Sequence, residues 1–231
     1  MVFDPVYFLF IGPALLLSLW ASFRTKSAFN KYSKVRTARG FTGAQAAQVL
    51  LDRAGIRDVR IVPTHGYLSD HYNPVNKTLA LSEAVYSSTS VAAVGVACHE
   101  AGHAIQHATA YKPLALRSML VPTAGIGSSI GYFVMFFGLI LQSANMVVVG
   151  ALLFSAVLAF QLVTLPVEFD ASNRAKRLAT EYAIVLPQER EGMDRVLNAA
   201  ALTYVAAAVS TLLTLLYFLL RAGLLGGGNR D

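Results

Sequence analysis

Four long apolar stretches dominate the hydrophobic pattern of this chain. They cover residues 5–23, 118–141, 146–165 and 197–220, and each approaches or exceeds the roughly 20 apolar residues that cross a bilayer as a helix. Only residues 142–145 separate the second stretch from the third, so these two helices are expected to form an antiparallel hairpin. The pattern predicts a mainly α, multi-pass membrane protein with about four transmembrane helices.

A long polar segment, residues 24–117, follows the first apolar stretch and contains elements of two kinds. Apolar residues recur at helical spacing over 42–54, which predicts an amphipathic helix. Short β-branched or alternating stretches at 59–62 and 77–81 predict strands, separated by residues typical of turns. The run 91–110 follows three Ser/Thr residues and contains no proline, so it predicts a capped, buried helix. A small β element is therefore expected among helices.

The basic residues set the predicted topology. Lys and Arg are frequent in residues 24–117 and 166–196 and absent from the turn at 142–145. Because basic loops stay in the cytoplasm, both polar segments are expected there, with the two termini outside. The first apolar stretch follows Asp4 and precedes the basic residues, which is the polarity of an anchor and not of a cleaved signal peptide. The sequence predicts a plasma-membrane protein with its polar segments in the cytoplasm.

Composition agrees with a membrane protein and argues against nucleic-acid binding. Charged residues make up 14% of the chain, against roughly a quarter in soluble domains. The net charge of +6 comes largely from basic residues beside the apolar stretches, where they set topology or contact anionic lipid. The sequence has no zinc-finger spacing and no basic stripe interleaved with aromatic residues. The lipid bilayer is the expected partner, and nucleic acid is not.

The most informative motif lies in the predicted helix 91–110, where His99-Glu100-Ala101-Gly102-His103 matches HExxH. Residues four apart share one helix face, so His99 and His103 can offer two imidazole nitrogens to one Zn²⁺. Glu100 is then placed to act as the general base on a water. A chance match is disfavoured, because burying Glu100 between two histidines in an Ala/Gly-rich helix is costly without a metal.

A zinc peptidase needs a third protein ligand and one open position. The helix ends too early to supply a third histidine, so the ligand is expected from another segment on the same side of the membrane. Glu168 is the preferred candidate, since it follows the apolar stretch 146–165. It begins a predicted helix, 168–182, and the next turn of this helix carries small side chains, which would allow close packing against the HExxH helix. Asp170 points elsewhere on that helix and is expected to have an outer or capping role, with ligation as the alternative.

The chain resembles the YugP-like family of membrane zinc proteases. The resemblance is carried by the HExxH motif between spans, the segment Pro-Val-Glu-Phe-Asp-Ala-Ser at 166–172 and Gly-Tyr-Leu-Ser-Asp-His-Tyr at 66–72. More distantly it is similar to the HtpX and Ste24 membrane proteases, where a Glu on a later helix completes a His-His-Glu site. In those proteases an Asp stands four residues after that Glu. Here Ser172 occupies that place, and Asp170 or Asp70 is expected to substitute.

Other polar residues near the motif are candidates for supporting roles. His107 lies one turn beyond His103, where it is expected to line the site or contact a ligand more often than to bind metal. His71 or Tyr72 is a candidate to stabilise the oxyanion, although a plain loop position is an equal alternative. If His71 stabilises the oxyanion, it is a catalytic group beside Glu100.

Together these features predict one membrane-embedded metallopeptidase domain over residues 1–231, with a zincin-like cytoplasmic portion. Its expected function is zinc-dependent endoproteolysis of membrane-proximal or unfolded protein substrates, bound beside an edge strand at 77–81. An intramembrane protease of the site-2 type is the first alternative, although its Asn-Pro-Asp-Gly or Leu-Asp-Gly segment is absent from the sequence. A transporter or an inactive scaffold is the second, disfavoured by nearly charge-free spans and an intact Glu100.

Overall fold

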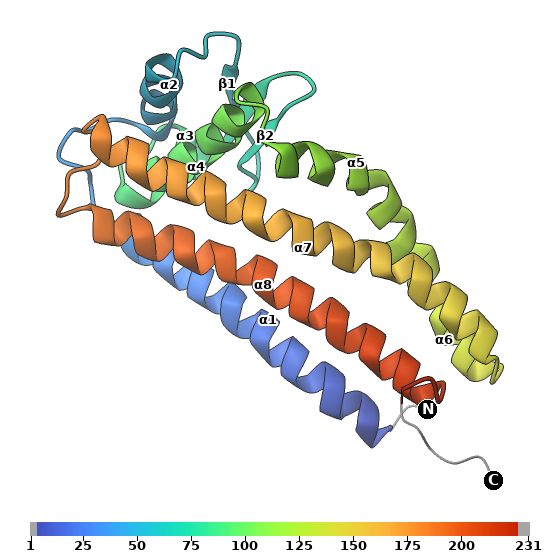
Figure 1. The fold of residues 1–231 in the computed structure, drawn as a ribbon. Helices are drawn as coiled ribbons and strands as arrows, with labels where there is room; N and C mark the ends of the chain where they lie inside the picture. Colours follow the sequence, from blue (N-terminus) through green and yellow to red (C-terminus); the bar gives the residue numbers. More distant parts are fainter. Residues whose placement is uncertain (1–3, 226–231) are drawn as a thin grey trace. The chain divides into compact units, whose positions relative to one another are not determined.

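The computed structural model describes residues 4–225 and is mainly helical with a small sheet. Four helical stretches are long and apolar enough to cross a membrane, which confirms the predicted fold class (Figure 1). These candidate spans are Pro5–Tyr32, Lys112–Ile140, Ala144–Glu181 and Arg190–Arg221. In chain order the elements are α1 (Pro5–Tyr32), α2 (Gly43–Arg53), β1 (Arg60–Thr64), β2 (His71–Asn73), β3 (Thr78–Ser82), α3 (Glu83–Tyr86), α4 (Val91–Ala108), α5 (Lys112–Ile126), the π-helical η1 (Gly127–Gly131), α6 (Tyr132–Ile140), α7 (Ala144–Glu181) and α8 (Arg190–Arg221).

The chain forms two compact units. Among the described residues, the first comprises 4–21, 116–165 and 203–225, and the second comprises 22–115 and 166–202. Helices α1, α5, α7 and α8 each contribute residues to both units. The first unit therefore holds most of the apolar stretches, and the second holds the polar segments and the HExxH motif.

Small residues bring helices close together in the first unit. A Cβ added at Gly131 of η1 would lie 2.7 Å from the backbone nitrogen of Phe154 on α7. One added at Gly150 would lie 2.5 Å from the backbone nitrogen of Met135 on α6. Backbones that approach this closely need glycine at the contact, as is usual between helices in lipid. The hairpin expected from the short turn at residues 142–145 is thus closely packed.

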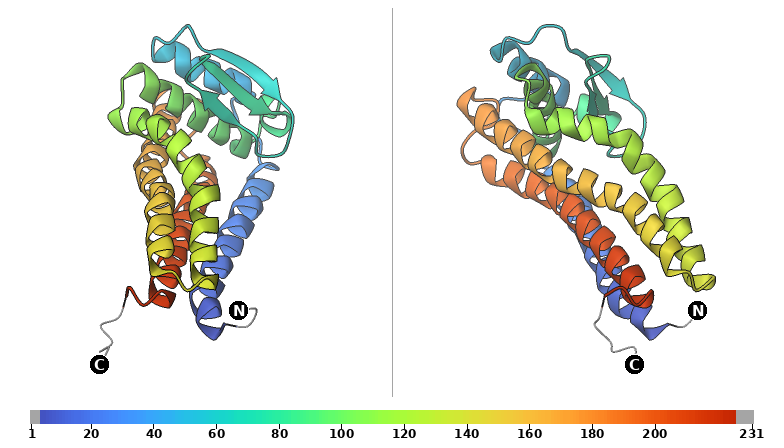
Figure 2. Two further views of the ribbon diagram at one scale, coloured as in Figure 1. Left: turned by 90° about the vertical axis from the view of Figure 1, so that its right-hand side faces the viewer. Right: turned by 45° about the vertical axis from the view of Figure 1, so that its right-hand side comes forward.

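Helix α4 lies at the centre of the second unit. Its N-terminus is capped by Ser90, whose side chain accepts a hydrogen bond from the backbone N–H of Ala93, as predicted. Helices α2 and α3 and strands β2 and β3 all contact α4, and Figure 2 shows the sheet beside α2 and α4. Leu50 of α2 and Leu79 of β3 are fully buried in the shared core. Burial of these apolar side chains holds α4 in place.

The sheet differs from the prediction in its order. Strand β3 lies in the middle, parallel to β1 and antiparallel to β2. The expectation that residues 77–81 form an edge strand is therefore wrong. The cause is β2, a three-residue strand in the segment that was predicted to be a turn, which pairs with Thr78–Ala80.

Helix α7 also differs from the prediction, because it continues through Pro166. The sequence predicted an apolar span ending near residue 165 and a separate helix from 168. Proline removes one backbone donor and often kinks a helix, but it does not always end it. Glu168 is therefore on the same helix as the apolar stretch that precedes it.

Candidate metal centre

The HExxH residues lie on α4 within the second unit. Glu100 and His103 are almost fully buried, with 8% and 6% of their surfaces exposed, and His99 is partly buried. The two imidazole rings stand edge to face, with their centroids 4.7 Å apart. This is the arrangement expected for residues one turn apart that share a helix face.

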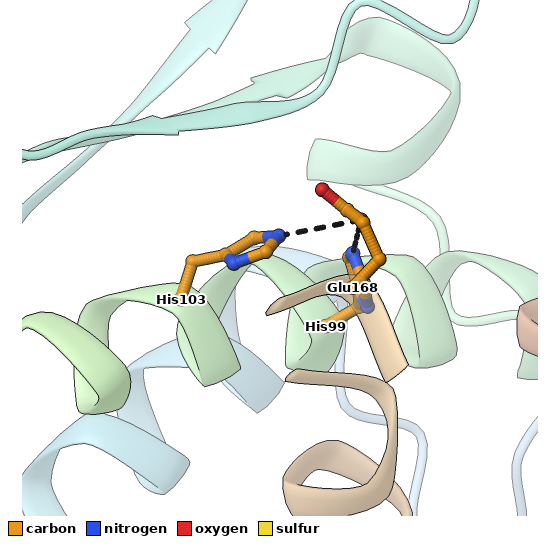
Figure 3. Close-up of side chains that lie close together, drawn as sticks. All are labelled: His99, His103 and Glu168. Carbon is orange, nitrogen blue, oxygen red and sulfur yellow. Dashed lines mark ion pairs between the residues drawn. The ribbon is translucent and has the colours of Figure 1, made fainter. Parts of the chain in front are cut away.

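Glu168 of α7 completes a group of three potential metal ligands. Its Oε2 lies 3.2 Å from Nε2 of His99 and 3.6 Å from Nε2 of His103. Figure 3 shows the two imidazoles on α4 and the carboxylate converging on a common point. One donor atom from each residue lies within 4.8 Å of the others. The sequence expectation that Glu168 approaches the two histidines agrees with this geometry.

The donor set fits zinc. Two imidazole nitrogens and one carboxylate oxygen form a ligand set used by zinc peptidases, which leaves a fourth position open. Glu168 is 2% exposed, and a buried carboxylate needs compensating positive charge. Glu168, His99 and His103 would hold a cation that supplies this charge.

Hydrogen bonds to the outer nitrogens orient both imidazoles. The Oγ atom of Ser172 lies 3.0 Å from Nδ1 of His99, and the Oε1 atom of Gln106 lies 3.0 Å from Nδ1 of His103. Since the amide oxygen of Gln106 only accepts, Nδ1 of His103 carries the proton and Nε2 keeps its lone pair. Partners of this kind fix the tautomer that binds a metal.

Gln106 links the histidine to α7, a role that the sequence analysis missed. Its Nε2 donates to the backbone oxygen of Val167 and to Oδ2 of Asp170, both at 2.8 Å. Asp170 also accepts a hydrogen bond from Nε of Arg174. Asp170 thus reaches His103 through Gln106, and Ser172 contacts the other histidine directly. Gln106 lies three residues after His103 on the same helix face, which is the one signal that marks it in the sequence.

The carboxylates beside His103 favour a positive charge in the site, either as a second proton on the imidazole or as a metal cation that takes its place. Burial of the imidazole lowers its pKa, but a hydrogen bond to Glu168 and the nearby Glu100 and Glu168 carboxylates raise it more, so the pKa of His103 lies above its ordinary value. The same carboxylates attract a metal cation bound at Nε2.

A glycine allows α4 and α7 to approach at the metal centre. A Cβ added at Gly102 would lie 2.6 Å from the backbone oxygen of Ala171. Any larger residue would therefore push the two backbones apart. The glycine inside the HExxH motif is required by packing as well as by access.

The remaining predicted residues lie outside the group of three. His107 and Tyr72 contact each other, with 2.8 Å between Nδ1 and the hydroxyl oxygen. His71 is exposed, and its Nδ1 contacts the backbone oxygen of Ser69. Because side chains alternate along a strand, Tyr72 points toward α4 and His71 points to the opposite face of β2. Asp70 accepts hydrogen bonds from the backbone and the hydroxyl of Ser82, which fixes the start of β2.

Comparison with known proteins agrees with the chemistry of this site. The model of a family described as "Putative neutral zinc metallopeptidase" matches residues 7–223. The chain is 45% identical over 214 residues to the "Putative membrane protease YugP" of Bacillus subtilis (strain 168), covering 92% of this chain and 95% of that protein. No solved structure matches the chain.

Proposed function

The chain belongs to this family of neutral zinc metallopeptidases, and we propose from that premise that it is a zinc-dependent endopeptidase anchored in the plasma membrane. The observation that carries the proposal is the convergence of His99, His103 and Glu168 on one point. We take these three residues as the metal ligands and the fourth position as the place for water or substrate.

Glu100 is the proposed general base. It is adjacent to His99 on α4 and buried beside the ligands. Zinc held there supplies Lewis acidity, which lowers the pKa of water and polarises the scissile carbonyl. The carboxylate of Glu100 accepts the proton of the attacking water and then passes it to the leaving amine.

The open edge of β2 is the proposed binding site for the substrate backbone. Strand β2 lies at one side of the sheet, and Tyr72 in this strand contacts His107 on the HExxH helix. An extended peptide can add to such an edge through main-chain hydrogen bonds. Of the two oxyanion candidates in this strand, we prefer Tyr72, which faces α4, over His71, which points to the opposite face of β2.

We further propose that substrates are unfolded or membrane-proximal protein segments in the cytoplasm. Glu168 follows the apolar stretch of α7 by a few residues, so the metal lies within a few helical turns of the end of that stretch, at about 1.5 Å per residue. The basic residues of both polar segments favour the cytoplasmic side. We also treat residues 1–231 as one functional domain, because four helices contribute residues to both compact units.

The position of the motif favours this proposal over an intramembrane protease. Helix α4 is not among the four candidate spans of the described residues. Its neighbours α2, β2 and β3 belong to the polar segment. A site-2-type protease would carry HExxH on a span.

Zinc content and proteolysis of the purified protein test the proposal. We expect about one zinc per chain, and cleavage of an unfolded protein substrate. Glu100→Gln should retain zinc and lose roughly 10²–10⁴-fold in activity, because it removes the general base. Glu181→Gln, an exposed substitution at the end of α7, is the matched control and should leave both unchanged. Full activity in Glu100→Gln, or activity in zinc-free protein, would refute the proposed mechanism.

Tethered substrates test where cleavage occurs. One unstructured site is placed at increasing distances from the membrane anchor of a model substrate, and the same site is presented in a soluble unfolded protein. We expect faster cutting near the membrane. Equal cutting at all distances and in the soluble protein would show that the membrane anchors the enzyme without selecting its substrates.

A further inference from the structure

A cavity of about 450 Å³ lies between α1 and α8 within the second unit, lined by residues other than the candidate metal ligands. Its volume falls within the roughly 300–1,000 Å³ of small-molecule sites. On α1 it is lined by Arg24, Ser27, Ala28 and Lys31. These residues are spaced i, i+3, i+4 and i+7, so they form one face of the helix.

Helix α8 supplies the opposite wall with the same spacing. The lining residues there are Arg195, Asn198, Ala199 and Leu202. Two helix faces of matching length therefore line the two sides of this open cavity. Each presents basic or polar groups together with small or apolar ones.

The two helices contact each other along these faces. The hydroxyl of Thr25 donates to the backbone oxygen of Ala199 at 2.9 Å. A Cβ added at Gly192 would lie 2.7 Å from Cδ1 of Tyr32, so the Tyr32 ring packs directly against α8 there. These pairs show that α1 and α8 run antiparallel on the two sides of the cavity.

The lining is suited to an anion. Three of the nine residues that line the cavity are cationic, namely Arg24, Lys31 and Arg195, and none of the nine is acidic. Arg195 pairs with Glu191 at 2.7 Å, but both side chains are largely exposed, and such surface pairs contribute little. The Lys31 ammonium lies 5.3 Å from the centre of the Tyr32 ring, which holds it at the cavity wall.

The cavity occurs where both helices change from apolar to basic residues. On α1, exposed Phe23 is followed directly by Arg24. On α8, Arg195 precedes the apolar stretch that begins at Leu197. Lipid headgroups lie at such a boundary, and basic pockets between spans bind anionic headgroups.

We propose that this cavity is a binding site for a phosphate anion, supplied by the headgroup of an anionic phospholipid. The guanidinium groups of Arg24 and Arg195 and the ammonium of Lys31 pair with the phosphate, since arginine matches its oxygens in a bidentate fork. Asn198 and Ser27 supply further hydrogen bonds, and Leu202 contacts the start of the acyl chains. The three cations disfavour a choline headgroup, which carries its own positive charge.

Trp20 provides a probe for the test. It is the single tryptophan of the chain, is 47% exposed, and precedes Arg24 by one turn of α1. The full chain is reconstituted in phosphatidylcholine vesicles that contain phosphatidylglycerol, and one of the two lipids carries brominated acyl chains, which quench tryptophan. At equal mole fractions, we expect brominated phosphatidylglycerol to quench Trp20 several-fold more effectively than brominated phosphatidylcholine.

Matched variants identify the residues responsible. Lys31→Gln and Arg195→Gln should each lower the preference for phosphatidylglycerol by roughly three- to fivefold, as expected for one cation near an anionic lipid. The double variant should abolish it. Arg177→Gln is the control, because Arg177 is exposed, pairs with Glu181 and does not line the cavity. Equal effects of Arg177→Gln and the cavity variants would overturn the proposal.

Inorganic phosphate distinguishes the two sources of the anion. Calorimetric titration of phosphate into protein in pure phosphatidylcholine vesicles, at constant ionic strength, measures a soluble ligand. Phosphate binding without a lipid preference, lost in the double variant, supports the phosphate site and assigns it to a soluble source. Absence of both lipid preference and phosphate binding overturns the proposal, whether or not the protein has peptidase activity.

Discussion

The hydroxyl of Ser172 lies 3.0 Å from Nδ1 of His99, on the same face of α7 as Glu168 and one turn further along. One helix face therefore both approaches the metal position and orients a histidine on the neighbouring helix. A serine makes this contact, and not Asp170 or Asp70, which were expected from the sequence. A serine side chain is shorter than that of a carboxylate residue and carries no charge. Its removal should therefore weaken zinc binding without abolishing it.

The first prediction concerns this contact. Ser172→Ala should lower zinc affinity about tenfold, at the weak end of the roughly 10–100-fold range for outer partners of a ligand. Affinity is measured by competition with a zinc chelator. Ser33→Ala, an exposed serine after α1, is the control and should bind zinc as the wild type does. Identical affinities in Ser172→Ala and Ser33→Ala would mean that the hydroxyl does not orient His99.

The second prediction separates the two carboxylates of α7. Glu168→Gln should lower zinc affinity by roughly 100-fold or more, because it removes a proposed ligand. Asp170→Asn should lower it by about tenfold, because Asp170 acts through Gln106. Zinc per chain is measured by mass spectrometry of the metal after dialysis. The reverse order of the two variants would exchange their roles.

The third prediction concerns the contact between α4 and α7. Gly102→Ala should destabilise the protein by about 1–3 kcal/mol, the usual cost of overpacking, and should lower zinc affinity, because the added Cβ meets the backbone of Ala171. Gly125→Ala is the control, since nothing lies within 4 Å of its added Cβ. There the substitution should stabilise the helix by about 0.5–1 kcal/mol. Thermal unfolding of both variants shows whether each substitution lowers or raises the stability of the protein.

The fourth prediction concerns Cys98. Burial raises the pKa of this thiol to about 12, and its side chain is fully buried in α4. Because the thiolate is the reactive form, almost none is present at pH 8. A maleimide should leave the native protein unmodified and label it after denaturation. Rapid labelling of the native protein would show that α4 is accessible.

The fifth prediction concerns topology. Because the native Cys98 is expected not to react, labelling reports only on cysteines that are introduced elsewhere. Cysteines introduced at Lys34 and Asn145, both exposed, should react with an impermeant maleimide from opposite sides of the membrane. Residue 34 is expected in the cytoplasm and residue 145 outside. Reaction of both from one side would contradict the proposed arrangement of spans.

Much of the architecture could be predicted because it follows from composition and from the spacing of apolar residues along the chain. The apolar stretches, the capped helix α4 and the motif His99–His103 depend on residues close in sequence. Glu168 could be predicted as well, because the site needs a third ligand and few carboxylates follow an apolar span. These inferences rest on local spacing and on the chemistry of zinc.

Other features could not be predicted because they depend on contacts between distant segments. Strand β2 has three residues, too few to show an alternating pattern, and it is defined by pairing with β3. Gln106 is uncharged, and its role depends on Val167 and Asp170 of α7 lying beside it. Pro166 ends many helices, and the sequence does not show that α7 continues through it.

The separation of the proposed ligands along the chain bears on biosynthesis. His99 and His103 leave the ribosome well before Glu168, and two candidate spans lie between them and this carboxylate, the second being the helix that carries it. A nascent chain therefore has two histidines but cannot complete the donor set until α7 has been made and inserted. With the proposed ligand set, proteolytic activity would be withheld during synthesis, and the unfinished chain could not attack its own exposed segments or those of neighbouring nascent chains.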